Sequence, residues 1–145
     1  MTTVTMTSTF ETTTTQAPAF PGGVSRAPRV LLRLEGAIML VGAVAAYAHL
    51  GAGWGTFAAL ILAPDLAFFG YVAGPRVGAV AYNATHSYLG AAVLAAASVA
   101  IGMPALLPLA VVWAGHVGFD RMLGYGLKYG GAFGFTHLGR VGKDA

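Results

Sequence analysis

From Val30 onward, the sequence consists of long apolar runs separated by short breaks that contain Gly and Pro. The breaks fall at residues 51–55, 74–75 and 102–104. They divide the chain into four segments, each with about the 20 residues that a helix needs to cross the hydrocarbon core of a bilayer. The segments are 30–50, 54–73, 77–101 and 104–124. Because the breaks are short, we expect neighbouring helices to run antiparallel.

Composition supports a membrane protein. The chain has 145 residues, of which 57% are hydrophobic and only 9% are charged, whereas soluble domains average about 25% charged residues. Its excess apolar surface must therefore face lipid. The sequence predicts an all-α integral membrane protein, built as a four-helix bundle over residues 30–124.

The basic residues predict the orientation of this bundle. With four crossings, all eight Lys and Arg fall on one side of the membrane, which the positive-inside rule makes cytoplasmic. These residues are Arg26, Arg29, Arg33, Arg76, Arg121, Lys128, Arg140 and Lys143. We therefore expect both chain ends in the cytoplasm of a bacterium and a multi-pass protein of its inner membrane. The net charge of +3 does not indicate nucleic-acid binding, since the cations flank apolar runs and form no basic stripe.

Two end regions differ from the bundle. Residues 1–29 begin with a Thr-rich stretch and continue with three prolines, a composition typical of a solvated, disordered tail. Residues 125–145 are rich in Gly and aromatic residues but too polar to cross again. We expect this C-terminal part to lie at the cytoplasmic interface.

Apart from His49 at the outer end of the first span, five Asp, Glu and His side chains lie inside the predicted spans, where a charge costs about 2.5–3.5 kcal/mol on insertion scales. At about 1.5 Å per helical residue, each lies within about 15 Å of the cytoplasmic end of its span. His116 and Asp120 are also four residues apart and share a helix face. The five candidate site residues are Glu35, Asp65, His86, His116 and Asp120.

This set of carboxylates and imidazoles predicts a metal site on the cytoplasmic side. Oxygen and nitrogen ligands without any cysteine suit Zn, Mn or non-haem Fe. We expect the metal ligands to be Asp65, His86, His116 and Asp120, with Glu35 as a further ligand or general base.

Structural alternatives remain open for the same residues. The acidic side chains could form ion pairs with nearby cations, and the histidines could form hydrogen bonds between helices. The pairs in question are Glu35 with Arg33 or Arg76, Asp65 with Arg76, and Asp120 with Arg121 or Lys128.

Several motifs spread over residues 31–142 resemble a small bacterial integral-membrane family known only as domain of unknown function 4260. The resemblance implies a membrane protein but no reaction. The motifs are Leu62-Ala-Pro-Asp-Leu66, Gly70-Tyr-Val-Ala-Gly-Pro-Arg-Val-Gly78, Tyr82-Asn-Ala-Thr-His86, His116-Val-Gly-Phe-Asp-Arg-Met-Leu-Gly-Tyr-Gly-Leu-Lys-Tyr129 and Thr136-His-Leu-Gly139.

Three shorter motifs are similar to those of predicted membrane-bound metal-dependent hydrolases. They are Pro64-Asp65, Thr85-His86-Ser87 and the pair His116 and Asp120, in the same order as in that family. The family usually has a second Asp where this chain has Ala67, and a His-Arg pair where it has Ala81-Tyr82. Two of the ligands that the resemblance implies are therefore missing, and Glu35 could replace one.

Four functions fit these observations. The first is a metal-dependent enzyme, a hydrolase acting on a lipid-linked phosphoester or acyl ester from the cytoplasmic side. The second is a small transporter or proton-coupled carrier, for which a homodimer would enclose a pathway. A haem held by His86 and His116 and a purely structural membrane protein are the other two.

Overall fold

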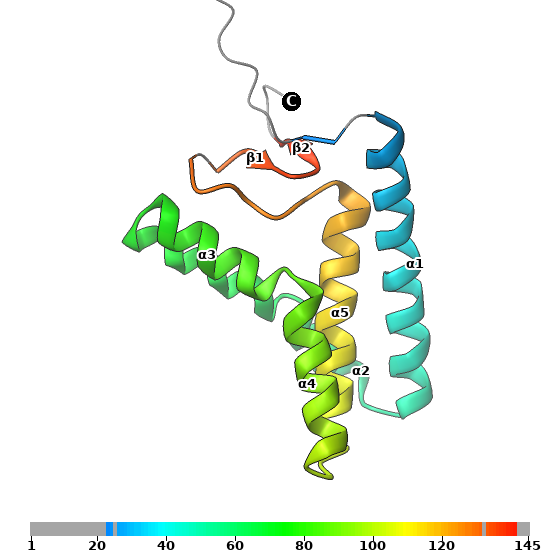
Figure 1. The fold of residues 1–145 in the computed structure, drawn as a ribbon. Coiled ribbons are helices and arrows are strands. Elements are labelled where there is room, and N and C mark those ends of the chain that lie inside the picture. Colours follow the sequence, from blue (N-terminus) through cyan, green and yellow to red (C-terminus); the bar gives the residue numbers. More distant parts are fainter. Residues whose placement is uncertain (1–22, 25, 132, 142–145) are drawn as a thin grey trace, which may run out of the picture.

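The computed structural model describes residues 23–24, 26–131 and 133–141, and most of them are helical (Figure 1). The helical fold class expected from the sequence is confirmed. Of the tail predicted over residues 1–29, residues 1–22 and 25 lie outside the described residues, and α1 begins at Arg26. In chain order the elements are α1 (Arg26–Leu50), α2 (Trp54–Leu60), the 3₁₀ helix η1 (Ala63–Ala73), α3 (Pro75–Thr85), α4 (Tyr88–Ala100), α5 (Leu106–Leu123), β1 (Phe135–Thr136) and β2 (Gly139–Arg140).

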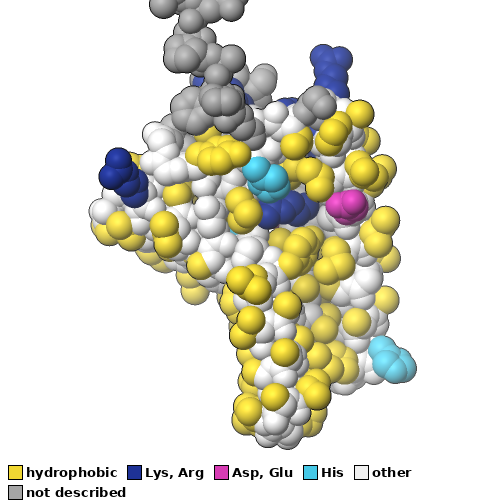
Figure 2. Space-filling view, in the orientation of Figure 1, with side chains coloured by type: hydrophobic (Ala, Val, Ile, Leu, Met, Phe, Trp, Pro, Cys, Tyr) yellow, Lys and Arg dark blue, Asp and Glu magenta, His cyan; other side chains and the backbone are white. Residues whose placement is uncertain are grey.

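Among the described residues, three helical segments are long and apolar enough to cross a membrane. They are Arg26–Leu50, Trp54–Ala73 and Leu106–Leu123, while α4 is apolar but has only 13 residues. Many large apolar side chains on these helices are exposed, among them Val99, which is 78% exposed. Figure 2 shows hydrophobic side chains over most of the visible face, whereas Lys and Arg lie toward the end that carries the C-terminal segment. Such a surface suits contact with lipid.

The helices α1 and α5 lie side by side (Figure 1) and approach closely at two glycines. A Cβ atom on Gly36 would lie 2.5 Å from the Cβ of Arg121, and one on Gly118 would lie 2.8 Å from the carbonyl oxygen of Gly36. Glycine is therefore required at both positions. Close contact through small residues is the usual way in which helices associate in lipid.

The second and third apolar segments, each predicted as one span, are both interrupted. The second segment changes direction after α2, where Pro64 lies in the first turn of η1. Proline lacks the backbone N–H that a continuing helix needs, and its ring clashes with the preceding turn. The third segment breaks at His86 and Ser87, between α3 and α4. Both breaks occur next to predicted site residues.

Beyond these breaks, η1 and α3 pack together and form an arm that diverges from the axis of α1 and α5 (Figure 1). Gly74 joins the two with a φ of 110°, a backbone conformation that favours glycine. At Gly78 an added Cβ would overlap the ring of Tyr71, so the absence of a side chain lets this ring pack on α3. The 11 residues of η1 are long for a 3₁₀ helix.

The C-terminal segment, comprising residues 125–131 and 133–141, folds back over one end of the helices (Figure 1). Its strands β1 and β2 pair antiparallel, with Phe135 opposite Arg140. Asn83 of α3 holds the segment by two hydrogen bonds: its amide donates to the carbonyl of Lys128 at 2.8 Å and accepts from the N–H of Lys128 at 2.6 Å. His137 has a structural role here, since its Nδ1 accepts from the N–H of Leu127 at 2.8 Å.

Candidate metal centre

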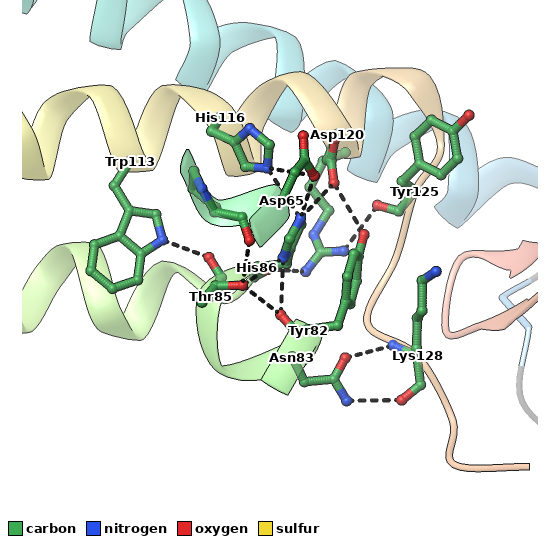
Figure 3. A network of polar contacts seen from close by, with 12 residues as sticks. Asp65, Tyr82, Asn83, Thr85, His86, Trp113, His116, Asp120, Tyr125 and Lys128 are labelled. Carbon is green, nitrogen blue, oxygen red and sulfur yellow. Dashed lines mark hydrogen bonds and ion pairs between the residues drawn. The ribbon is translucent and has the colours of Figure 1, made fainter. Parts of the chain in front are cut away.

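Three predicted ligands meet where the arm joins the helices (Figure 3). Asp65 lies in the first turn of η1, His86 follows the last residue of α3, and His116 is buried in α5. The interruption after α2 brings Asp65 to this point, and the end of α3 turns the His86 ring toward it. Three separate elements thus each supply one side chain.

The ligand atoms have the spacing of a metal coordination shell. The Nε2 atoms of His86 and His116 are 3.1 Å apart, and Oδ1 of Asp65 lies 3.2 Å from the former and 3.7 Å from the latter. Ligand atoms bound to a tetrahedral ion at about 2.0–2.1 Å lie about 3.3 Å from one another. A divalent ion therefore fits among these three atoms without large movements.

Hydrogen bonding to the backbone suits His86 to metal binding. Its Nδ1 lies 3.0 Å from the carbonyl oxygen of Tyr82, which can only accept, so a proton on Nδ1 satisfies both groups. In that tautomer the Nε2 of the neutral ring presents its lone pair to Asp65 and His116. This arrangement, with the second ring nitrogen bonded to a carbonyl, is the usual one for a metal-binding histidine.

Thr85 connects the two helix breaks. Its hydroxyl donates to the carbonyl oxygen of Pro64 at 3.1 Å and lies 2.9 Å from Nδ1 of His86. The carbonyl of Thr85 accepts in turn from the indole N–H of Trp113 on α5 at 2.5 Å. The positions of Asp65 and His86 are therefore set by the same residue (Figure 3).

Asp120 lies beside the three ligands, one helical turn from His116 as expected. Its Oδ2 is 3.5 Å from Nε2 of His86 and accepts a hydrogen bond from the hydroxyl of Tyr82 at 3.1 Å. An ion pair with Arg121 was an alternative, but Arg121 donates to the carbonyl oxygens of His86 and Tyr125. Asp120 therefore lies outside the group of three ligand atoms but next to it, where its carboxylate can act as a base beside the metal or move in as a fourth ligand.

The centre opens into a cavity of about 340 Å³ beneath the C-terminal segment, which is within the usual range for small-ligand sites. Asp65, Asp120, Tyr82 and Lys128 are among its polar lining residues, and Phe68 and Phe133 are among its apolar ones. The His86 and His116 side chains are only 1% exposed, whereas that of Asp65 is 37% exposed. Access to the centre is therefore from the carboxylate side.

Glu35 is the one predicted site residue that the structure does not bring to this centre. It is an exposed residue of α1, while the described residues that line the cavity come from η1, α3, α5 and the C-terminal segment. Depth along a helix predicted Glu35 as a member of the site, but depth does not determine which way a side chain faces. Its role as a ligand or base stays a prediction.

Two residues of the site were not identified from the sequence. Tyr82 precedes His86 by four residues, a spacing that places both on one helix face, and their rings stack with centroids 3.7 Å apart. Lys128 was considered only as a cytoplasmic cation and as an ion-pair partner of Asp120, yet it is 6% exposed and lines the cavity. Burial lowers the pKa of Lys128 to about 8, although the carboxylates of Asp120 and Asp65 oppose this change.

The same geometry argues against a haem held by the two histidines. Axial ligands bind the iron from opposite faces of the porphyrin, but the two Nε2 atoms are 3.1 Å apart and Asp65 contacts both. A porphyrin does not fit between these imidazoles.

Comparisons with known proteins identify a family but no activity. No curated protein and no solved structure matches the chain. One family model, described as "Domain of unknown function (DUF4260)", matches residues 29–141, a range that includes every predicted site residue. The chain therefore belongs to this family of unknown function.

Proposed function

We propose that this protein is a membrane-embedded, metal-dependent hydrolase. The observation that carries the proposal is the spacing of Asp65 Oδ1, His86 Nε2 and His116 Nε2, at 3.1–3.7 Å, next to an accessible cavity. Three potential ligand atoms directed at one point would be stabilised by a cation between them, which would also offset the charge of the carboxylate. Zn, Mn and Fe suit this ligand set, and the resemblance to predicted membrane-bound hydrolases gives the reaction class.

We further propose a four-span arrangement with both chain ends in the cytoplasm of a bacterium. The chain would cross with α1, with α2 and η1, with α3 and α4, and with α5. The arm of η1 and α3 would then lie in the cytoplasmic leaflet, with Arg76 at its tip, and the C-terminal segment at the interface above it. The cavity would face the cytoplasm at the depth of lipid headgroups. A homodimer would hold two such sites, because one chain supplies all the ligands.

The substrate class is a lipid-linked ester. Hydrolysis adds the oxygen of one water to the phosphorus or the carbonyl carbon, breaks the bond to the alcohol oxygen, and delivers a proton to that oxygen. A bound divalent ion would polarise the ester and acidify water. Asp120 lies next to His86 and would accept the proton of the attacking water. Tyr82 orients Asp120 through its hydroxyl.

Metal content tests this function. We expect about one ion per chain in purified protein, by inductively coupled plasma mass spectrometry, after exposure to Zn²⁺, Mn²⁺ or Fe²⁺. D65N and H116Q should lose the ion, because each removes one of the three ligands. H49Q is the matched control, since His49 is exposed at the far end of α1. A parent protein without stoichiometric metal would refute the proposal.

A proton-coupled carrier is the second candidate, and the interrupted helices favour it. Transporters often place titratable groups at broken helices near the middle of the membrane, and here Asp65 and His86 adjoin two such breaks. A single proton shared among Asp65, His86 and His116 would satisfy the same three atoms as a metal ion. Reconstituted vesicles that acidify in a D65N-sensitive manner, from protein that contains no metal, would establish the carrier instead.

A further inference from the structure

Lys128 holds its ammonium group among aromatic rings in the cavity. Its Nζ lies 3.1 Å from the ring centroid of Phe133, 4.5 Å from that of Tyr82, 4.9 Å from that of Phe68 and 5.5 Å from that of Tyr71. We call these four rings the aromatic cage. They come from η1, α3 and the C-terminal segment, so the cage forms only when all three are assembled.

The position of this charge needs an explanation. A lysine near the cytoplasmic interface usually extends its ammonium into water, because burial of a charge is unfavourable. The backbone of Lys128 is instead fixed by Asn83 and by a bridge to Thr136. Its ammonium is retained by cation–π attraction to the cage. The fold thus keeps a positive charge inside the cavity, where the carboxylates of Asp65 and Asp120 also lie.

Tyr82 links this charge to the metal centre. One ring carries three contacts: it stacks on His86 at 3.7 Å, its hydroxyl donates to Asp120, and it lies under the ammonium of Lys128. Because the ring of Tyr82 contacts both His86 and Lys128, a group that enters the cavity lies close to the metal ligands and to the ammonium group at the same time. Figure 3 shows Tyr82 and Lys128 extending in the same direction, toward Asp120 and Tyr125.

We propose that Lys128 is the anion-binding residue of this cavity and that the substrate carries a phosphate, bound between the ammonium group and the metal centre. This inference rests on the proposed function and chooses between the two ester classes left open above, since an acyl ester has no anionic group for Lys128 to bind. Lysine is a common phosphate-binding residue. Hydrolysis would transfer the phosphoryl group to water, break the bond to the alcohol oxygen, and return one proton to that oxygen.

The carboxylates make phosphate binding depend on metal. Without a cation, Asp65 and Asp120 repel a phosphate, and Lys128 alone does not neutralise both. With a divalent ion on Asp65, His86 and His116, the cavity gains two positive charges and attracts the anion. We therefore expect phosphate to bind the metal-loaded protein and not the protein treated with chelator.

Isothermal titration of metal-loaded protein with inorganic phosphate tests the proposal. K128Q removes the charge, and we expect its Kd for phosphate to rise at least about tenfold while its metal content stays unchanged. K128R keeps a positive charge and should bind more tightly than K128Q. R140Q is the matched control: Arg140 also lies over one ring, that of Phe135, but it does not line the cavity. Its Kd should equal that of the parent.

The results separate this inference from the function on which it rests. If the parent holds no metal, the proposed function fails. If the parent holds metal but binds no phosphate, or K128Q binds it as tightly as the parent, only the role of Lys128 fails. Thermal unfolding shows whether K128Q keeps the fold. If K128Q is unfolded, the Kd of K128R for phosphate, compared with that of the parent, decides the outcome.

A competition experiment distinguishes the sources of the phosphate. The metal-loaded protein is placed in nanodiscs of phosphatidylcholine with or without phosphatidic acid. Weaker binding of inorganic phosphate in the presence of phosphatidic acid would assign the site to a lipid phosphate. Equal binding in both membranes would assign it to soluble phosphate esters.

Discussion

Replacement of Thr85 by valine tests whether the hydrogen bonds around the helix breaks hold the metal ligands in place. Valine has nearly the same shape as threonine but lacks the hydroxyl. T85V therefore removes the hydrogen bond to the carbonyl of Pro64, at 3.1 Å, and the contact with Nδ1 of His86, at 2.9 Å. All three proposed ligands remain present. Any loss of metal affinity then reflects orientation rather than ligand number.

The expected magnitude follows from these contacts. A hydrogen bond contributes about 0.5–1.5 kcal/mol, and loss of a partner that orients a ligand typically lowers metal affinity about 10- to 100-fold. The carbonyl of Tyr82 still accepts from Nδ1 of His86 at 3.0 Å in T85V, so part of the orientation persists. We therefore expect a loss near the lower end, about tenfold in Kd, without a change in metal stoichiometry.

Competition with a chromophoric chelator measures this Kd directly. T56V is the matched control, because Thr56 is an exposed residue of α2 that does not line the cavity, and its Kd should equal that of the parent. If T85V holds one metal ion with a Kd within twofold of the parent value, the reasoning is refuted. The orientation of His86 would then not depend on Thr85.

Three further predictions concern packing, the C-terminal segment and pH. G118V should lower the free energy of unfolding by about 1–3 kcal/mol, because an added side chain meets the backbone of α1 at 2.8 Å. G42A, where a Cβ meets nothing within 4 Å, should match the parent in thermal unfolding. Equal unfolding midpoints for the two variants would contradict the packing of α1 against α5. N83A removes both hydrogen bonds to Lys128 and should speed limited trypsin cleavage after Lys128 severalfold, whereas an unchanged cleavage rate would show that the segment is held by other contacts. Phosphate binding should weaken as pH rises through about 8, because burial lowers the pKa of Lys128 to about 8 and the side chain loses its proton there. The Kd of K128R for phosphate should change much less with pH. Identical pH profiles of the Kd for the two proteins would exclude Lys128 as the anion-binding residue.

Much of the site could be predicted from the sequence because a membrane restricts where charge is tolerated. Asp65, His86 and His116 are rare residue types in apolar segments, and counting from the cytoplasmic ends placed them at similar depth. The structure brings these three together. Asp120 followed from its spacing to His116. Depth could not reveal which way Glu35 faces, since that depends on how α1 packs against α5 through Gly36 and Gly118.

The bent helices and the cage around Lys128 were harder to predict. Pro64 was visible in the sequence, yet a long apolar run around a proline is also compatible with a kinked but continuous helix. The break at His86 has no such residue, and it depends on the hydrogen bonds of Thr85 and Arg121 to distant elements. The backbone of Lys128 is held at the cavity by Asn83, 45 residues earlier, and by a bridge to Thr136. Contacts of this kind have no local pattern.

X-ray absorption spectroscopy at the edge of the bound metal tests the central claim most directly. The account predicts two imidazole nitrogens at about 2.0–2.1 Å together with carboxylate oxygen, and no metal absorption edge above background in H116Q, which loses the ion. A bound metal without imidazole scattering, or a spectrum that H116Q leaves unchanged, would contradict a centre formed by Asp65, His86 and His116.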